Sequence, residues 1–200
     1  MLSIRLKAIA GYIDEESKVI DVGCDHALLD IYLTKEKHCK CTAVDISEKC
    51  ILKAKKNIKD AGVNVDTIVS DGLKNIKIND EIIVLSGLGT KTITSIIPNA
   101  LTNDLIISSH KNLETLRRKM HKKGYYIYDE KAIFDKKYYV IMYFKKGRKR
   151  ENYYVSRFLV NDKGYMSYLL SGYEKVYKNT KSKLKKIKMY FIIRKIKKYI

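Results

Sequence analysis

The residues best suited to chemistry lie in the stretch SKVIDVGCDHALLDIYL, which covers residues 17–33. Asp21 stands inside an apolar run that ends at Gly23, and Asp25 and His26 follow directly. A carboxylate in a buried strand must be paired or hydrogen-bonded, so Asp21 could accept from loop N–H groups or bind the ammonium group of a ligand. Gly23 would let the backbone approach that ligand, and His26 would either contact it or bond to nearby backbone.

Three later strand patterns end in residues that suit a nucleoside. Asp45 ends the second pattern, where an acidic side chain can accept hydrogen bonds from both ribose hydroxyls. Asp71 and Gly72 could bind the exocyclic amine of an adenine, and Ser86 and Gly87 offer bare backbone beside a reacting centre. A strand-end aspartate also serves as a helix cap or a turn residue, so it is the ordered set of strand ends that favours a nucleoside.

The glycine pattern narrows the choice of nucleotide. The segment DVGCD lacks the G-x-G-x-x-G loop that a dinucleotide pyrophosphate needs, which argues against a nucleotide-dependent oxidoreductase. A cofactor with an adenine, a ribose and an amino acid end in place of the diphosphate fits the strand ends. We therefore predict S-adenosylmethionine as the cofactor.

Alternating strand and helix patterns must position these side chains. Strands are expected over residues 18–22, 40–44, 64–70, 81–87 and 104–108, with a hairpin of two long strands over 125–146. Helices are expected over 4–13, 26–35, 47–62, 90–97 and 113–124, with Ser3 and Ser47 as caps and Gly62 as a helix end. This order predicts an α/β fold of the Rossmann-like class, with a doubly wound, mostly parallel sheet and a terminal antiparallel hairpin. Ligands of such sheets bind beyond the carboxyl ends of the strands.

The chain changes character after Gly147. Residues 1–144 hold 23 Lys/Arg and 19 Asp/Glu, whereas residues 145–200 hold 18 Lys/Arg and 3 Asp/Glu. We therefore assign residues 1–147 to a ligand-binding domain and residues 148–200 to a basic C-terminal segment. Such a concentration of positive charge suits a polyphosphate, and nucleic acid more than an anionic membrane surface.

The basic segment carries two amphipathic patterns. Apolar residues recur at helical spacing over residues 151–178 and 181–198, with a break at Asn179-Thr180. Two such helices joined by a short turn predict an antiparallel helical hairpin that resembles a coiled coil.

The remaining composition limits metal, redox and membrane chemistry. The four cysteines, Cys24, Cys39, Cys41 and Cys50, match no zinc spacing, so we expect reduced thiols and no bound metal. The sequence has neither a secretory leader pattern nor an apolar run long enough to span a bilayer. We expect a cytoplasmic protein without a membrane partner.

Several segments together resemble the bacterial TrmK family of tRNA methyltransferases. They are IDVGCDHALLDIYL, AVDIS, SDGL and LSGLGT, together with the opening LSIRLKAIAGYI, which has Ser3, Arg5 and Leu6 in place. The likeness covers most of the chain, including the C-terminal hairpin. The D-x-G-x-D-H-A-x-L string is the most specific part, because ordinary class I methyltransferases carry a second glycine where Asp25 stands.

The resemblance implies an enzyme that uses S-adenosylmethionine to methylate N1 of adenine 22 in the D-arm of tRNA. The implied cofactor pocket consists of Asp21, Gly23, Asp25, His26, Asp45, Ile46, Asp71, Gly72, Ser86 and Gly87. We give Asp25 a catalytic role as well, because methylation makes the adenine ring cationic and a nearby carboxylate would stabilise the developing charge.

Basic residues would help to hold a tRNA whose target base must be unstacked. We assign Lys183, Lys185, Lys186 and Lys188 to this task, and a solvated helical face is the alternative. Arg5 could bind a phosphate or the cofactor carboxylate, or be a surface charge, and we group it with the RNA-binding residues. We expect a monomer that binds tRNA.

Three departures from the family pattern are visible. Asp30 replaces a proline, Gly87-Leu88-Gly89-Thr90 replaces GMGG, and Ser108-Ser109-His110 replaces a triplet resembling Gln-Pro-Asn. The last departure lies at the strand end that should face the target base. It keeps two alternatives open: methylation of another RNA base, or a catalytically silent RNA-binding protein with the same fold.

Overall fold

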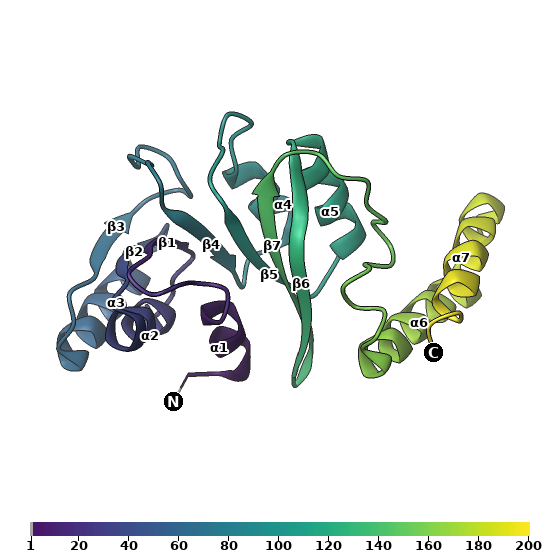
Figure 1. The fold of residues 1–200 in the computed structure, drawn as a ribbon, viewed down its shortest axis with the longest axis horizontal. Coiled ribbons are helices and arrows are strands. Elements are labelled where there is room, and N and C mark those ends of the chain that lie inside the picture. The colour runs from purple at the N-terminus through teal and green to yellow at the C-terminus, as the bar shows by residue number, and fades with distance from the viewer. Residues whose placement is uncertain (1) are drawn as a thin grey trace.

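The structure is a computed structural model that describes residues 2–200, and it is built on one seven-stranded sheet (Figure 1). The strands are β1 (Lys18–Val22), β2 (Lys40–Asp45), β3 (Asp66–Val69), β4 (Ile82–Ser86), β5 (Leu105–Ser109), β6 (Tyr125–Asp135) and β7 (Lys137–Lys146). The helices are α1 (Ile4–Ala10), α2 (Leu28–Lys37), α3 (Glu48–Ala61), α4 (Thr90–Ile96), α5 (Leu113–Lys122), α6 (Lys163–Asn179) and α7 (Lys183–Ile196).

The sheet has the predicted topology. Its strand order is β3-β2-β1-β4-β5-β7-β6, in which β1 to β5 are parallel and β7 runs antiparallel to both β5 and β6. The order reverses at β1, which pairs with β2 on one side and with β4 on the other. In a doubly wound sheet the crevice at this reversal is where ligands bind.

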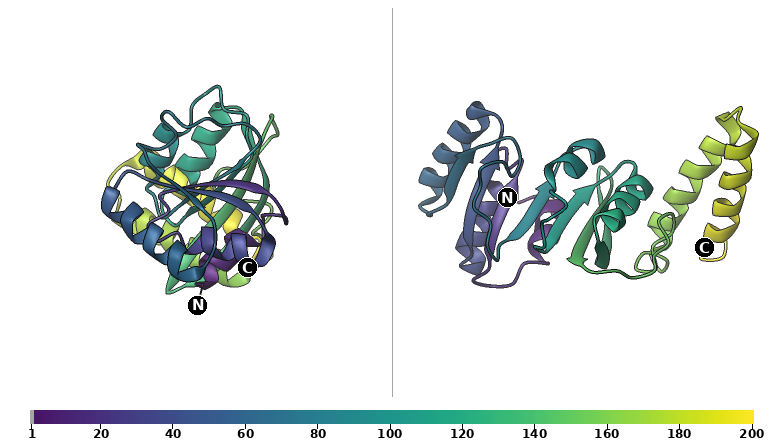
Figure 2. Two further views of the ribbon diagram at one scale, coloured as in Figure 1. Left: turned by 90° about the vertical axis from the view of Figure 1, so that its left-hand side faces the viewer. Right: turned by 90° about the horizontal axis from the view of Figure 1, so that it is seen from above.

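Two layers of helices cover the sheet, as the views in Figure 2 show. Helices α1, α2 and α3 pack on one face, and α4 and α5 pack on the other. Successive residues of β1 alternate between these layers, because side chains of a strand point to opposite faces. Val19 packs with α1, α2 and α3, whereas Ile20 and Val22 belong to the opposite core, so Asp21 points toward the α2 side.

The predicted capping residues are confirmed. Ser3 accepts a hydrogen bond from the backbone N–H of Leu6 at 3.2 Å, and Ser47 accepts one from Cys50 at 3.4 Å. Gly62 ends α3 in the left-handed conformation with φ +66°. These local signals fix where α1 and α3 begin and where α3 ends.

The first C-terminal helix is shorter than the sequence predicts. Residues 151–162 form turns, and α6 begins only at Lys163. The Asn152 side chain accepts hydrogen bonds from two of the backbone N–H groups that follow it, which competes with helix formation. Asp162 then caps α6 by accepting from the N–H of Tyr165. The predicted helix over 151–162 is therefore wrong, while the predicted break at Asn179-Thr180 is confirmed.

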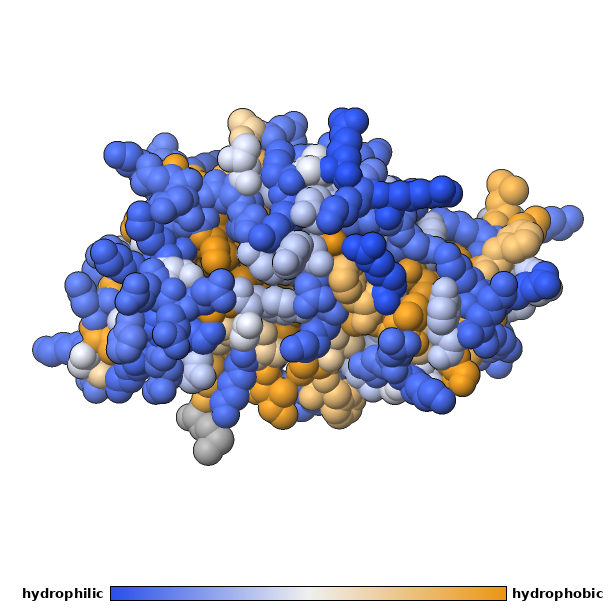
Figure 3. Space-filling model, in the orientation of Figure 1, coloured by the Kyte–Doolittle hydropathy of each residue, from blue (hydrophilic) through white to orange (hydrophobic). Residues whose placement is uncertain are grey.

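Helices α6 and α7 form an antiparallel pair beside the β6–β7 end of the sheet (Figures 1 and 2). Their buried residues Met166, Met189, Ile192 and Ile196 are continuous with the core on the α4–α5 face. Figure 3 shows apolar surface exposed where this pair meets the rest of the molecule, framed by hydrophilic side chains. Within residues 2–200, no helix has the length and apolar character that a membrane crossing requires.

Candidate active site

A pocket of about 330 Å³ opens at the carboxyl ends of β1, β2 and β4, beside the reversal in strand order. Seven of the predicted cofactor residues line it: Asp21, Gly23, Asp25, His26, Asp45, Ser86 and Gly87. The remaining lining comes from Arg5, Leu6, Cys24, Leu28, Leu29 and Leu88. Its volume lies at the lower end of the roughly 300–1,000 Å³ that small-molecule sites occupy.

Three predicted cofactor residues lie outside this lining. Ile46 is 68% exposed, and the Asp71 carboxylate forms an ion pair with Lys74 at 2.5 Å. Gly72 is required for packing, because a Cβ at this position would lie 2.7 Å from the Ile96 side chain. Their contact with an adenine stays a prediction.

The loop between β1 and α2 has an unusual backbone. Gly23 has φ +82° and donates its N–H to the carbonyl of Val44 at 2.8 Å, which ties the loop to β2. Asp25 and Ala27 also lie in the left-handed region, with φ +52° and +53°, and this delays the start of α2 to Leu28. Non-glycine residues in this region cost roughly 1–3 kcal/mol each, so the surrounding contacts must hold the loop in place.

The Asp45 carboxylate is one of these contacts. Its Oδ2 accepts from the N–H of Asp25 at 3.3 Å, and its Oδ1 accepts from the N–H of Ser47 at 2.8 Å. Asp45 is therefore a turn residue and also a lining residue of the pocket. The Asp25 side chain is 66% exposed, and its Oδ2 lies 3.5 Å from Nε2 of His26. Asp25 and His26 thus present a carboxylate and an imidazole together at the mouth of the pocket.

Asp21 and Asp30 form a buried pair of carboxyl groups beneath the pocket. Asp30 extends from the first turn of α2 and has no exposed surface, while Asp21 is 4% exposed. Burial raises the pKa of Asp21 to about 7, and burial followed by the charge of Asp21 holds the pKa of Asp30 well above its usual range. Within residues 2–200 no hydrogen-bond donor contacts either oxygen of Asp30, so burial of the two neighbouring carboxyl groups favours the protonated form over two negative charges.

The sequence analysis noted Asp30 as a replacement for proline but gave it no partner. The available signal was an acidic residue directly after Leu28-Leu29, in a helix whose apolar side faces the core. Within residues 2–200 no N–H or hydroxyl donates to Oδ1 of Asp21. This oxygen has almost no exposed surface, but Asp21 lines the pocket, and a carboxyl group there suits a cationic ligand group better than a phosphate.

Arg5 reaches this pocket rather than the open surface. Its Nη1 donates to the Ser86 hydroxyl at 2.5 Å, and its guanidinium stacks over Tyr139 at 5.1 Å from the ring centroid. It also lowers the pKa of Asp21 against the larger effect of burial. Of the alternatives considered for Arg5, this placement favours contact with a cofactor carboxylate over the grouping with RNA-binding residues.

The departure at 108–110 leaves one side chain available to a substrate. Ser108 and Ser109 are buried, at 1% and 4% exposure, so only His110 is open. Nε2 of His110 lies 3.1 Å from Nζ of Lys137, and the ring stacks at a tilt on Tyr139. Burial and the charges of Lys137, Lys111 and Arg5 lower the pKa of His110. Because a lysine ammonium only donates, Nε2 accepts and His110 is neutral.

One thiol contacts the proposed site, because Sγ of Cys50 donates to Oδ1 of Asp25 at 3.8 Å. All four cysteines are free, and burial raises the pKa of Cys24, Cys39 and Cys41. The part of the chain that the structure describes contains no group of three His, Cys, Asp or Glu side chains that could hold a metal ion. The pocket therefore relies on carboxylates, one guanidinium and backbone.

Comparisons with known sequences place the chain among methyltransferases. The family described as a methyltransferase domain matches residues 2–142. The Mycoplasma genitalium protein MG248, provisionally named a tRNA methyltransferase, is 30% identical over 154 residues, which cover 72% of this chain and 70% of that protein. The tRNA (adenine(22)-N(1))-methyltransferase of Bacillus subtilis is 30% identical over 138 residues, covering 64% of this chain and 58% of the relative.

A solved structure extends the similarity to the whole chain. The TrmK protein of M. capricolum, in complex with the cofactor product S-adenosyl-homocysteine, superposes with a TM-score of 0.85 at 30% identity. The match covers 100% of this chain and 97% of that one, so it includes the α6–α7 pair. The sheet topology and the helical pair predicted from the sequence are thus those of a solved structure.

Proposed function

The chain belongs to the TrmK family of tRNA methyltransferases, and from this premise we propose that it methylates N1 of adenine 22 in the D-arm of tRNA. It is a class I methyltransferase that depends on S-adenosylmethionine. The observation that carries the proposal is the pocket itself. Asp21, whose buried Oδ1 has no hydrogen-bond donor within residues 2–200, lines it together with Arg5 and Asp45, and the sequence has no phosphate loop.

The pocket residues match the parts of this cofactor. Asp45 would accept hydrogen bonds from the ribose hydroxyls, as strand-end carboxylates do in Rossmann-like folds. Asp21 and Arg5 would hold the ammonium and carboxylate of the methionine end. Gly87 leaves room beside them, because a Cβ at this position would meet nothing within 4 Å. Bound S-adenosylmethionine supplies an electrophilic methyl group on its sulfonium.

The contribution of the chain to the chemistry is mainly alignment. N1 of neutral adenine already has an in-plane lone pair, so no residue has to remove a proton before attack. Holding the nucleophile in line with the methyl group can supply roughly 7–11 kcal/mol of the barrier reduction. The tethered β1–α2 loop and the Arg5–Ser86 hydrogen bond keep the pocket wall in a fixed geometry for this purpose.

We infer that Asp25 acts during methyl transfer itself, when positive charge develops on the adenine ring. Its carboxylate is exposed at the pocket mouth, and the hydrogen bond from its N–H to Asp45 fixes its position. The adenine ring becomes cationic as the bond to carbon forms, so this carboxylate stabilises the developing charge. Nε2 of His26 lies 3.5 Å from Oδ2 of Asp25, and we infer that His26 helps to orient this carboxylate.

The division of labour follows the domains we propose, with residues 1–147 binding cofactor and target base and residues 148–200 binding tRNA. N1 lies on the pairing edge of adenine, so the base must leave its stack at a cost of a few kcal/mol. Contacts between the basic hairpin and tRNA phosphates offset this cost. Lys183, Lys185, Lys186 and Lys188 are all exposed on α7 and free to make them.

Methylation of a defined substrate tests the proposal. Purified protein, labelled S-adenosylmethionine and unmodified tRNA should give N1-methyladenosine at position 22, identified by nuclease digestion and mass spectrometry of the products. A tRNA with guanine at position 22 is the matched control and should stay unlabelled. Methylation of another base, or cofactor binding without any transfer to tRNA, would contradict the proposal and direct attention to His110.

A further inference from the structure

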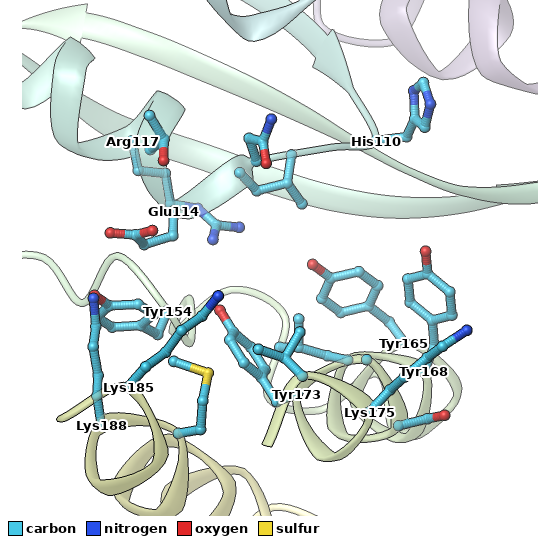
Figure 4. Close-up of a pocket in the computed structure, with 18 of the residues that line it drawn as sticks. His110, Glu114, Arg117, Tyr154, Tyr165, Tyr168, Tyr173, Lys175, Lys185 and Lys188 are labelled. Atoms are coloured by element: carbon cyan, nitrogen blue, oxygen red, sulfur yellow. The ribbon is translucent and has the colours of Figure 1, made fainter. Parts of the chain in front are cut away.

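A second cavity lies away from the cofactor pocket, between α5 and the α6–α7 pair (Figure 4). It has a volume of about 1020 Å³, three times that of the cofactor pocket. We call it the hairpin groove. In Figure 4 its tyrosine and lysine side chains rise from the hairpin and the preceding turn toward α5, and His110 lies on the opposite wall. The proposed catalytic step uses none of the tyrosines or lysines that line it.

Aromatic rings form two platforms in the hairpin groove. Tyr168 is 48% exposed and stacks at a tilt on Tyr138, with ring centroids 4.9 Å apart. Tyr154 and Tyr173 form an edge-to-face pair at 6.4 Å, and Nζ of Lys188 lies 5.0 Å from the Tyr154 ring centroid. An aromatic ring that is half open to solvent but held by a neighbouring ring is a suitable surface for stacking a base.

The charge of the hairpin groove is positive. Lys175, Lys185 and Lys188 line it and are exposed, and none of them forms an ion pair with another residue of the described range 2–200. The acidic lining residue Glu114 is already paired with Arg118. Three uncompensated lysines around open aromatic rings complement a phosphate backbone with unstacked bases.

The position of the hairpin groove links it to the cofactor pocket. His110 follows the end of β5, and Ser108 of β5 pairs with Ser86 of β4, which lines the cofactor pocket. Arg5 also connects the two sites, because it contacts Ser86 of the cofactor pocket and the Tyr139 ring that stacks on His110. An RNA chain that places one base over the cofactor pocket can therefore reach the hairpin groove with neighbouring nucleotides.

We propose that the hairpin groove binds unpaired nucleotides of the same tRNA, with bases stacked on Tyr168 and on the Tyr154–Tyr173 pair and phosphates held by Lys185 and Lys188. This inference rests on tRNA being the substrate and deepens the proposed function. It turns the hairpin from a general cationic surface into a site that recognises single-stranded RNA at a fixed distance from the methylated base.

The hairpin offers a matched test of the phosphate contacts. Lys185 and Lys188 line the hairpin groove, while Lys195 and Lys198, two exposed lysines at the C-terminal end of the hairpin, do not. Lys185→Gln/Lys188→Gln should weaken binding to unmodified tRNA about tenfold and lower the salt slope by roughly two. Lys195→Gln/Lys198→Gln should change that affinity by less than about threefold. Both double variants lose two positive charges. A difference between their tRNA affinities, measured by electrophoretic mobility shift or anisotropy, therefore reports where the charges lie and not how many there are.

A tyrosine series tests the stacking. Tyr168→Ala should weaken tRNA binding by about tenfold, whereas Tyr168→Phe should retain wild-type affinity. Tyr190 is a half-exposed tyrosine of α7 outside the groove, so Tyr190→Ala should also retain wild-type affinity. Cofactor affinity and thermal stability serve as folding controls for each variant. Ultraviolet cross-linking of the wild-type complex should join groove residues to nucleotides other than adenine 22.

The outcomes separate this inference from the proposed function. Equal losses from the two lysine pairs, or equal effects of Tyr168→Ala and Tyr190→Ala, would overturn the groove assignment even if adenine 22 is methylated normally. If the groove variants lose affinity and the controls do not, the groove assignment holds even when methylation occurs at another base. Wild-type protein that binds no tRNA would overturn both.

Discussion

The cofactor pocket and the hairpin groove use polar side chains in opposite ways. In the pocket, Asp21 and Asp30 are buried, burial raises the pKa of both, and they lie under a strained loop tied to β2. In the groove, Lys185 and Lys188 are exposed and lack acidic partners within residues 2–200. A buried charge is costly and must be placed with care, whereas an exposed lysine costs little and can follow a flexible polyanion. Cofactor binding and stability should therefore depend on single side-chain substitutions in the pocket and on pH. Binding of tRNA in the groove should depend on salt concentration.

The largest effect should come from removing Asp45. Asp45→Ala deletes the acceptor for the ribose hydroxyls and for the N–H of Asp25, and two charge-assisted hydrogen bonds are worth about 100-fold in cofactor affinity. Calorimetric titration with S-adenosyl-homocysteine measures the loss. tRNA affinity should stay within twofold of the wild type, as the contrast between the two regions requires. Parallel losses in both affinities would mean that pocket and groove form one cooperative site.

The next effect concerns the rate rather than binding. Asp25→Asn removes the carboxylate charge but keeps a residue type that tolerates the left-handed backbone at φ +52°. Because the side chain is exposed, kcat should fall by roughly thirtyfold, less than the 100-fold or more for a buried stabilising group. Because asparagine keeps a hydrogen-bonding side chain in the cofactor pocket, cofactor affinity should fall much less than kcat, and tRNA affinity should not change. Full activity in single-turnover assays would remove Asp25 from the catalytic step.

Much of the cofactor site could be predicted because its signals are local. A glycine between an apolar run and an acidic residue marks a strand end, and Asp45 follows at the end of the next strand. Parallel strands bring such ends to one edge of a sheet, so Gly23, Asp45 and Ser86 meet without any knowledge of side-chain packing. The helix caps Ser3 and Ser47 were predicted for the same local reason.

What the sequence did not predict depends on contacts between distant segments. Asp30 is meaningful only because α2 lays it against β1, and Arg5 only because α1 reaches the Ser86 hydroxyl across 81 positions of the chain. The helical pattern over 151–162 failed because the carbonyl of Tyr153 accepts from Arg117 and the Asn152 side chain binds the local backbone. Tertiary and side-chain hydrogen bonds there override amphipathic periodicity.

The smallest expected effect is on the pH dependence of stability, which tests the buried pair Asp21 and Asp30. A carboxyl whose folded pKa is raised stabilises the protein below its unfolded pKa near 4, and this contribution is lost as pH rises through the folded value, about 7 for Asp21. Each such group lowers the free energy of unfolding by at most about 1.4 kcal/mol per pH unit across that window. Asp30→Asn keeps the size of the side chain and removes one of the two titrating groups. Between pH 5 and 7, the free energy of unfolding of this variant should therefore fall less steeply than that of the wild type, by about 1.4 kcal/mol per pH unit.

Urea denaturation at several pH values measures this difference without cofactor or RNA. Asp80→Asn is the control, because Asp80 is an exposed carboxylate paired with Lys18, and that ion pair lowers its pKa. Asp80→Asn should leave the slope of unfolding free energy against pH almost unchanged. Parallel curves for Asp30→Asn and the wild type would mean that Asp30 is already ionised in the folded protein at pH 5. A shallower curve would tie this part of the pH response to the buried carboxyl pair, whereas the groove lysines stay charged throughout this range.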